Sequence, residues 1–206
     1  MTKEKLIEGL ISAEYLKTSR IIEAFRAVDR ADFVPKEYQS EAYGNYPLSI
    51  GEGQTISQPL TVAFILELLQ PQIGDKVLDV GAGSGWQTAL IAYCVGEKGK
   101  VVAVERIKSL KDMADSNIKK YPKLAKRAEV ILGDGSKGYK PGAPYDKIIA
   151  AASGEDMPDA WRAQLKIHGR IVAPVQNSIV VWDKIDDKQF KKQEYSGFSF
   201  VPLIRE

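Results

Sequence analysis

A glycine-rich turn between a strand and a helix most limits what this chain can fold into. Residues 77–86 read VLDVGAGSGW, so an apolar run leads into Gly81, Gly83 and Gly85, and an apolar helix pattern follows at 86–95. Glycines let the main chain turn tightly and approach a ligand that a Cβ atom would block. Open α/β sheets bind ligands at such places, the carboxyl ends of their strands. A tight strand–helix turn without a ligand would use the same glycines.

The segments around and after the turn alternate between strand and helix patterns. We expect strands at 76–80, 100–105, 128–134, 145–152 and 169–175, and helices at 86–95, 107–120 and 158–165. This alternation predicts an α/β fold, a Rossmann-like and mostly parallel sheet with helices on both faces. The runs 178–185 and 195–204 are expected to pair as an antiparallel hairpin at the sheet edge.

The first third of the chain has a different pattern. Apolar residues recur at helical spacing around 6–11 and 21–28, and 60–70 is a largely buried helix pattern. Residues 43–59, YGNYPLSIGEGQTISQP, hold glycines and prolines and cannot be a helix. Long loops in compact domains are usually functional. With 206 residues, we expect one domain, 1–206, in which 1–59 is a helical extension with an active-site lid and 60–206 is the core.

Charge and cysteine content exclude several classes of protein. Lys and Arg number 29 against 27 Asp and Glu, and this balance gives no support for a nucleic-acid or membrane surface. Cys94 is the one cysteine, so neither an internal disulfide nor a cysteine-based zinc site is expected, and no metal site is. The apolar stretches are far shorter than the about 20 residues that cross a bilayer. A cytoplasmic protein is the expectation, with a monomer as the working assumption.

The residues near the glycine turn narrow the choice of ligand. A dinucleotide fingerprint would place its third glycine where Trp86 stands, and a P-loop sequence is absent. Asp79 suits a ligand with a positive amine. Glu105 ends the second strand and can take both hydroxyls of a ribose, and Asp134 ends the third and can accept from an adenine amine. Together these acids predict S-adenosylmethionine as the cofactor.

The acceptor of the methyl group is indicated by what the chain lacks. His168 is the one histidine and falls at a turn before a strand. An amine or hydroxyl acceptor usually needs a base to remove its proton. A carboxylate, with a pKa of about 4, is already an ionised nucleophile at neutral pH. Residues 51–59, GEGQTISQP, carry hydroxyls and amides that can bind a carboxylate, although a solvent-exposed turn is the competing interpretation.

Over nearly its full length, the chain resembles protein-L-isoaspartate O-methyltransferases. The matching stretches are RADFVP (30–35), AYGNYPLSIGEGQTISQP (42–59), KVLDVGAGSGW (76–86), VVAVER (101–106), GDG (133–135), YDKIIAAASGEDMP (145–158), QLKIHGRIVAPV (164–175) and FVPL (200–203). The glycine turn is common to methyltransferases, whereas GxGQTISQP is close to diagnostic of this family. The resemblance implies the S-adenosylmethionine-dependent methyltransferase fold.

The resemblance also implies the reaction and the site. S-adenosyl-L-methionine methylates the α-carboxylate of L-isoaspartyl residues in damaged proteins and peptides, and repair follows through a succinimide. Ser57 matches the serine treated as catalytic. The implied cofactor-binding residues are Gln54, Thr55 and Ile56 in the lid, Asp79, Gly81, Ala82, Gly83, Ser84 and Gly85 in the turn, Glu105 at the ribose, and Asp134 with Gly135 at the adenine.

Four places depart from the family pattern. Asn45 stands where aspartate is usual, Glu52 replaces a common histidine, Ile167-His168 replaces Pro-Gly, and Gln176 replaces a glycine. The carboxylate of Glu52 would disfavour an anionic acceptor unless it points to solvent. Two rival functions stay open: a methyltransferase of this fold with another acceptor, and a silent cofactor-binding adaptor.

Two further sequence features have both a structural and a functional interpretation. The tail FSFVPLI is expected to pack as an edge strand, with pairing to a bound peptide as the alternative. Trp86 is interpreted as a packing residue close to the cofactor turn.

Overall fold

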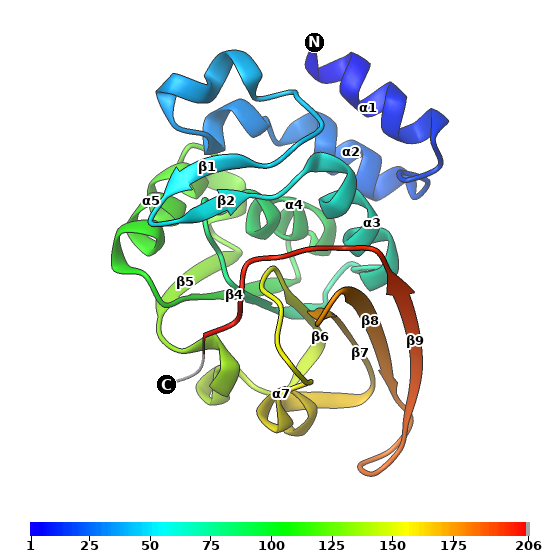
Figure 1. Ribbon diagram of the computed structural model, residues 1–206. Helices are drawn as coiled ribbons and strands as arrows, with labels where there is room; N and C mark the ends of the chain where they lie inside the picture. The colour runs from blue at the N-terminus through cyan, green and yellow to red at the C-terminus, as the bar shows by residue number, and fades with distance from the viewer. Residues whose placement is uncertain (205–206) are drawn as a thin grey trace.

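A seven-stranded sheet forms the centre of the molecule in the computed structural model, which describes residues 1–204 (Figure 1). Its strand order is β5-β4-β3-β6-β7-β8-β9. The first five are parallel, and β8 and β9 run antiparallel to their neighbours. The strands are β3 (Lys76–Val80), β4 (Lys100–Glu105), β5 (Ala128–Leu132), β6 (Tyr145–Ala150), β7 (Leu165–Val175), β8 (Ser178–Lys184) and β9 (Phe190–Ser196). The predicted α/β class with an antiparallel edge hairpin is confirmed.

Helices cover both faces of this sheet because alternate strand residues point to opposite sides. Val77 and Val101 pack into the core under α3 (Pro59–Leu69), α4 (Trp86–Val95) and α5 (Lys108–Lys119). Leu78 and Val102 pack into a second core with Trp161 of α7 (Asp159–Gln164). The short helices are α6 (Pro122–Ala125), η1 (Arg30–Phe33), η2 (Lys36–Glu41), η3 (Gly135–Lys137) and η4 (Lys140–Gly142).

The N-terminal extension lies over the first of these cores. Its helices α1 (Lys3–Ser12) and α2 (Ser19–Ala27) contribute Ile7 and Ile21, both about 1% exposed, to the same cluster as α4. The segment 43–59, expected as a loop, contains an antiparallel hairpin of β1 (Leu48–Gly51) and β2 (Gln54–Ile56). We call residues 48–56 the lid. Their short, glycine-interrupted strands carry too little alternation to predict a hairpin.

The expectation of a strand at 195–204 is wrong. The partner of β8 is β9, which ends at Ser196, and Gly197 then adopts a left-handed φ of 96°. Residues 198–204, which we call the tail, leave the sheet and cross the carboxyl ends of its strands, in red in Figure 1. Ser153 donates to Val201 O at 2.8 Å and accepts from Leu203 N at 2.7 Å. The apolar alternation therefore reflects packing across the strand ends, with Phe198 stacked on Phe64 of α3.

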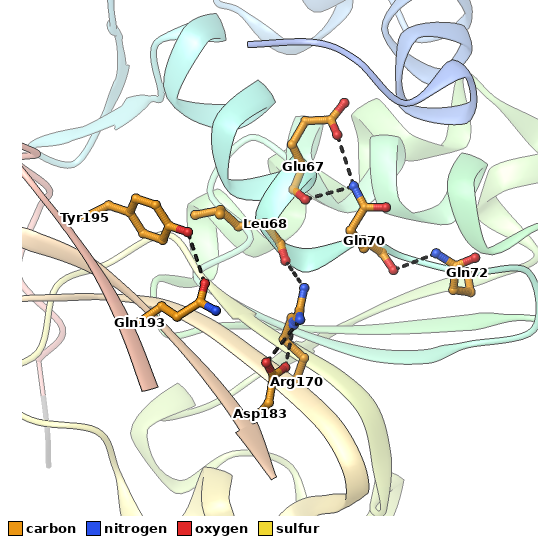
Figure 2. A network of polar contacts seen from close by, with 8 residues as sticks. All are labelled: Glu67, Leu68, Gln70, Gln72, Arg170, Asp183, Gln193 and Tyr195. Carbon is orange, nitrogen blue, oxygen red and sulfur yellow. Dashed lines mark hydrogen bonds and ion pairs between the residues drawn. The ribbon is translucent and has the colours of Figure 1, made fainter. Parts of the chain in front are cut away.

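Arg170 in β7 fixes the C-terminal end of α3 to the sheet (Figure 2). Its Nη1 donates to Leu68 O at 2.7 Å, while Nε and Nη2 donate to the two carboxylate oxygens of Asp183 at 2.6 and 3.1 Å. A bidentate arginine–carboxylate pair has defined geometry. These bonds hold the C-terminal end of α3 on the sheet.

Candidate active site

The glycine turn lies at the carboxyl end of β3, between neighbours β4 and β6, where the strand order reverses. Gly81, Gly83 and Gly85 have φ values of 86°, 53° and 88°, which side-chain-bearing residues rarely adopt. A Cβ atom on Gly85 would lie 3.1 Å from the Ala114 backbone of α5. Gly85 therefore serves close packing of the turn on α5, while Gly81 and Gly83 face a cavity.

Glu105, at the end of β4, is held against this turn. Its Oε2 accepts from Gly83 N at 2.9 Å and its Oε1 accepts from Ile107 N at 3.0 Å. The residue is 6% exposed and lines the cavity. Two backbone donors fix the carboxylate, and each oxygen retains a lone pair for a further donor. Glu105 can thus accept from a pair of neighbouring hydroxyls.

Asp79 lies beneath the turn. Its oxygens accept from Gln87 Nε2 at 2.7 Å and Thr88 Oγ1 at 2.6 Å, both from the first turn of α4. Burial raises the pKa of Asp79 to about 6. Gln87, which the sequence did not single out, lines a cavity, whereas Asp79 does not. Asp79 therefore positions Gln87 directly.

Asp134 begins the η3 turn rather than lining the cavity. Its Oδ1 accepts from Ser136 N at 2.9 Å and Ser136 Oγ at 2.7 Å, and its Oδ2 pairs with Lys137 at 3.3 Å. The neighbouring Gly135 does line the cavity. A Cβ on Gly135 would lie 2.5 Å from Val80 Cγ1, so this approach of η3 to β3 requires glycine.

Three adjoining cavities lie between the lid, the turn and the tail. The first, which we call the turn cavity, is lined by Gln54, Thr55, Val80, Gly81, Gly83, Val104, Glu105, Arg106, Ile107, Leu110, Gly135, Ala151, Ala152, Val201, Pro202, Leu203 and Ile204. The second, the outer cavity, is lined by Pro47, Thr55, Ser57, Gln58, Thr61, Ala151, Ser199, Phe200 and Val201. The third, the junction cavity, is lined by Thr55, Ile56, Ser57, Val62, Gly81, Ala82, Gly83, Ser84, Trp86, Gln87 and Ala151.

The shared lining shows how these cavities connect. Thr55 and Ala151 line all three, and Ser57 lines the outer and junction cavities. Ser57 therefore lies where a ligand extending from the glycine turn would meet a second ligand entering from outside. The sequence analysis assigned Ser57, Thr55 and the glycines to one site, but it did not assign Ala151 or the tail to that site. Ala151 could have been found from its place directly after a strand, since Ala150 ends β6 and the carboxyl ends of parallel strands form the site.

The segment that carries Ser57 is held from behind by Arg30, which is 2% exposed. Its guanidinium donates to Ser57 O at 3.1 Å and to four other main-chain carbonyls of 42–56. Ser57 itself precedes α3, whose first donor, Leu60 N, is satisfied by Asn45 Oδ1 at 3.0 Å. Asn45 thus acts as a cap for α3, which explains why a short polar residue occurs there.

The other departures from the family pattern have local explanations. Glu52, at the lid tip, accepts from Ser109 Oγ of α5 at 2.7 Å and lines none of the three cavities, so its charge does not face the outer cavity. His168 and Gln176, which stand at positions where the pattern has glycine, have φ values of 66° and 52°. At both positions the backbone has a left-handed conformation that glycine adopts readily, although the residue carries a side chain.

Neither a membrane span nor a metal centre is found in the part of the chain that the structure describes. Within residues 1–204, every helix is too short or too polar to cross a bilayer. The same residues contain no group of three or more His, Cys, Asp or Glu side chains arranged to hold a metal ion.

Comparison with known proteins gives one consistent result. The family model described as protein-L-isoaspartate(D-aspartate) O-methyltransferase matches residues 1–206. A protein-L-isoaspartate O-methyltransferase of Methanopyrus kandleri is 44% identical over 210 residues, covering 99% of this chain and 92% of that protein. One from Archaeoglobus fulgidus is 43% identical, covering 98% and 92%. A Plasmodium falciparum structure, provisionally assigned to this activity and in complex with S-adenosyl-L-homocysteine, superposes with a TM-score of 0.90 over the whole of both chains at 22% identity.

Proposed function

Because the chain belongs to the protein-L-isoaspartate(D-aspartate) O-methyltransferase family, we propose that the three adjoining cavities are the site of this family's reaction. The chain is a carboxyl methyltransferase that transfers a methyl group from S-adenosyl-L-methionine to L-isoaspartyl residues of proteins. The product ester starts repair, since it closes to a succinimide that opens in part to normal aspartate. The observation that carries the site assignment is the position of Ser57 between the outer and junction cavities.

The turn and junction cavities fit the methyl donor. Glu105 offers fixed carboxylate oxygens to a ribose diol, and Val104, Ile107 and Leu110 provide an apolar surface for a flat base. Gly81 and Gly83 allow the close backbone approach that the methionine part needs. Gln87, oriented by Asp79, lines the junction cavity beside these glycines, where the methionine part would lie. Bound S-adenosyl-L-methionine supplies an electrophilic methyl group on a positive sulfur.

The residues expected to bind the cofactor differ in role: some line the cavities, and others position or pack the residues that do. Gln54, Thr55, Ile56, Gly81, Ala82, Gly83, Ser84, Glu105 and Gly135 line the cavities, and we assign them direct contact. We assign Asp79 a positioning role through Gln87, and Gly85 a packing role against α5. Asp134 orders the η3 turn that carries Gly135. Contact of Asp134 with the adenine amine stays a prediction.

Ser57 is the residue that we expect to orient the acceptor. Its hydroxyl can donate to one oxygen of a carboxylate in the outer cavity, which leaves the other oxygen to attack the methyl carbon. The chain needs no base for this step, because the acceptor is already ionised at neutral pH. The protein's contribution is then alignment and exclusion of water by the lid and the tail.

A twin-peptide assay tests this function. Labelled S-adenosyl-L-methionine is supplied with an isoaspartyl peptide or with its aspartyl twin of the same sequence, and volatile methanol from ester hydrolysis is counted. We expect transfer to the isoaspartyl peptide alone. Equal labelling of both peptides, or labelling of neither while S-adenosyl-L-homocysteine still binds, would favour another acceptor or a silent adaptor.

The remaining assignments concern the cellular setting. We propose that the chain works as a monomeric, single-domain protein in the cytoplasm and that it acts on protein substrates without nucleic acid or membrane. The common core of the N-terminal helices with α4 supports one domain. The balanced charge and the buried, unpaired thiol of Cys94 support the setting. Light scattering at working concentration tests the monomer.

A further inference from the structure

A buried arginine behind the lid carries an inference about how the acceptor is received. Arg30, in the η1 turn, is far from the glycine turn in sequence, yet its guanidinium lies directly behind the main chain of Ser57. Nη2 donates to Ser57 O at 3.1 Å and to Ile56 O at 3.5 Å. Burial lowers the pKa of Arg30 to about 10, so the side chain stays protonated at neutral pH.

The same guanidinium also holds the segment that leads into the lid. Its hydrogen bonds reach Ala42 O at 2.7 Å, Gly44 O at 3.3 Å and Tyr46 O at 3.1 Å. The rigid, planar guanidinium of Arg30 therefore ties residues 42–46, which lead into β1, to the end of β2. Both ends of the lid are thus fixed to one side chain. A lysine has three donors on a flexible stem and cannot reproduce this fork.

No carboxylate among the described residues neutralises the charge of Arg30. Within residues 1–204 no carboxylate forms an ion pair with it, and its partners are neutral carbonyls. Its guanidinium carbon lies 5.4 Å from the ring centroid of Trp86, which follows the glycine turn. Arg30 Nε and Trp86 Nε1 are buried donors without an acceptor in the described residues. The region behind Ser57 thus holds a buried positive charge with carbonyl and aromatic partners but no carboxylate.

We propose that Arg30 is a positioning residue for the acceptor: it sets the place of Ser57 through the lid main chain, and its unpaired charge favours an anionic group in the outer cavity. The inference rests on the proposed function, because it takes the acceptor to be a carboxylate. Arg30 lines none of the three cavities and acts from behind Ser57, where a fixed positive charge offsets part of the cost of removing a carboxylate from water.

Two substitutions separate the two parts of the proposal. Arg30→Lys keeps the charge and loses the fork, whereas Arg30→Gln keeps an amide donor and loses the charge. We expect the lid to loosen in both, so kcat falls in both. The KM for the isoaspartyl peptide should be at least fivefold higher in Arg30→Gln than in Arg30→Lys. S-adenosyl-L-homocysteine carries no net charge, so its dissociation constant should not differ between the two variants.

Arg170 provides the matched control. It also donates to a main-chain carbonyl, Leu68 O, but it is paired with Asp183 and lies at the other end of α3 (Figure 2). Arg170→Lys should lower the melting temperature and leave the acceptor KM unchanged. Equal acceptor KM values in the two Arg30 variants would overturn the electrostatic part, and an increased KM in Arg170→Lys equal to theirs would reduce Arg30 to a general stabilising role.

Amide hydrogen exchange provides a readout that needs no turnover. In Arg30→Lys, amides of 42–57 should exchange at least tenfold faster than in the wild type, while the sheet and α5 are unchanged. Unaltered exchange in 42–57 would overturn the positioning part, and this measurement decides alone if the glutamine variant does not fold. A wild-type chain that cannot methylate the peptide would refute the proposed function and leave this exchange test intact.

Discussion

Glu52 Oε1 accepts a 2.7 Å hydrogen bond from Ser109 Oγ, and this bond joins the tip of the lid to the first turn of α5. Both residues are exposed, and Glu52 has a left-handed φ of 55° that turns it toward α5. Because Gln54 and Thr55 of the lid and Leu110 of α5 line the same cavity, the bond links two walls of the turn cavity. The lid is thus anchored at its tip by Ser109 and at its base by Arg30.

Loss of the tip anchor should weaken cofactor binding slightly. We expect Ser109→Ala to raise the dissociation constant of S-adenosyl-L-homocysteine about two- to fivefold, since an exposed hydrogen bond to a charged group contributes roughly 1 kcal/mol or less. Isothermal titration calorimetry measures the change. Ser116→Ala, an exposed serine of the same helix, is the control and should bind like the wild type.

Ser57→Ala should strongly reduce turnover. Without the hydroxyl, the acceptor carboxylate loses the donor that selects its orientation, and we expect kcat to fall by about 100-fold, the size of effect that a single misaligned contact can have. The dissociation constant of S-adenosyl-L-homocysteine should change less than threefold. Ser49→Ala, in the adjoining lid hairpin but outside the three cavities, should keep full activity. Unchanged turnover in Ser57→Ala would refute the assigned role.

The cap that Asn45 forms on α3 predicts a gain from aspartate. Asn45→Asp places a negative charge beside the Leu60 N–H at the positive end of the helix, which typically adds about 0.3–1 kcal/mol to the free energy of unfolding. Asn45→Ala should cost about 1 kcal/mol. Urea unfolding measures both. The aspartate gain should shrink at high salt, and a gain that is independent of salt would contradict the electrostatic explanation.

Gln176→Gly should stabilise the chain. Gln176 has a φ of 52° in the turn between β7 and β8, a conformation that costs a side-chain-bearing residue roughly 1–2 kcal/mol. Glycine relieves this and loses about 0.5–1 kcal/mol through the entropy of the unfolded chain. A net gain of about 0.5 kcal/mol is expected in urea unfolding. Asn177→Gly, at the next position of the turn, where no such strain exists, should be destabilising.

The raised pKa of Asp79 predicts a pH dependence of stability. Between the ordinary carboxyl pKa near 4 and the value of about 6 in the folded protein, the native state binds more protons than the unfolded state. The contribution to stability is therefore complete below about pH 4 and is lost as the pH rises through 6. From about pH 5 to pH 7, the free energy of unfolding should fall by roughly 1 kcal/mol more in the wild type than in Asp79→Asn.

Measurement of that slope needs only the difference between the two proteins. Asp79→Asn will alter the contacts to Gln87 and Thr88 and will shift absolute stability at every pH. The titrating groups that do not interact with Asp79 contribute equally to both proteins, so they cancel in the difference, and Glu105 is the titrating neighbour that does interact with it. Parallel curves for the two proteins across this range would contradict a raised pKa at Asp79.

The core of the fold was predictable because its signals are local. The central strands β3 and β4 are short apolar runs buried on both faces, and an apolar helix pattern follows at 86–95. The glycine turn was predictable for the same reason, since its φ values demand glycine whatever the surroundings. Glu105 followed from its place at a strand end.

Long-range contacts account for what the sequence did not reveal. The tail shows the same apolar alternation as a strand. Only the left-handed backbone at Gly197 and the β-bridge between Ser153 and Pro202 direct it over the strand ends. Nothing near Asp79 in the sequence indicates that Gln87 and Thr88 take up its oxygens. The place of Arg30 depends on carbonyls of residues 42–57, which periodicity cannot locate.

The tail supplies a wall of the turn cavity from outside the sheet. Residues 201–204 form one wall of the turn cavity, so that wall depends on how the tail lies across the strand ends and not on the sheet alone. A chain clipped after Ser196 would keep its lid, its glycine turn and every strand, yet the turn cavity would lose the wall that residues 201–204 form.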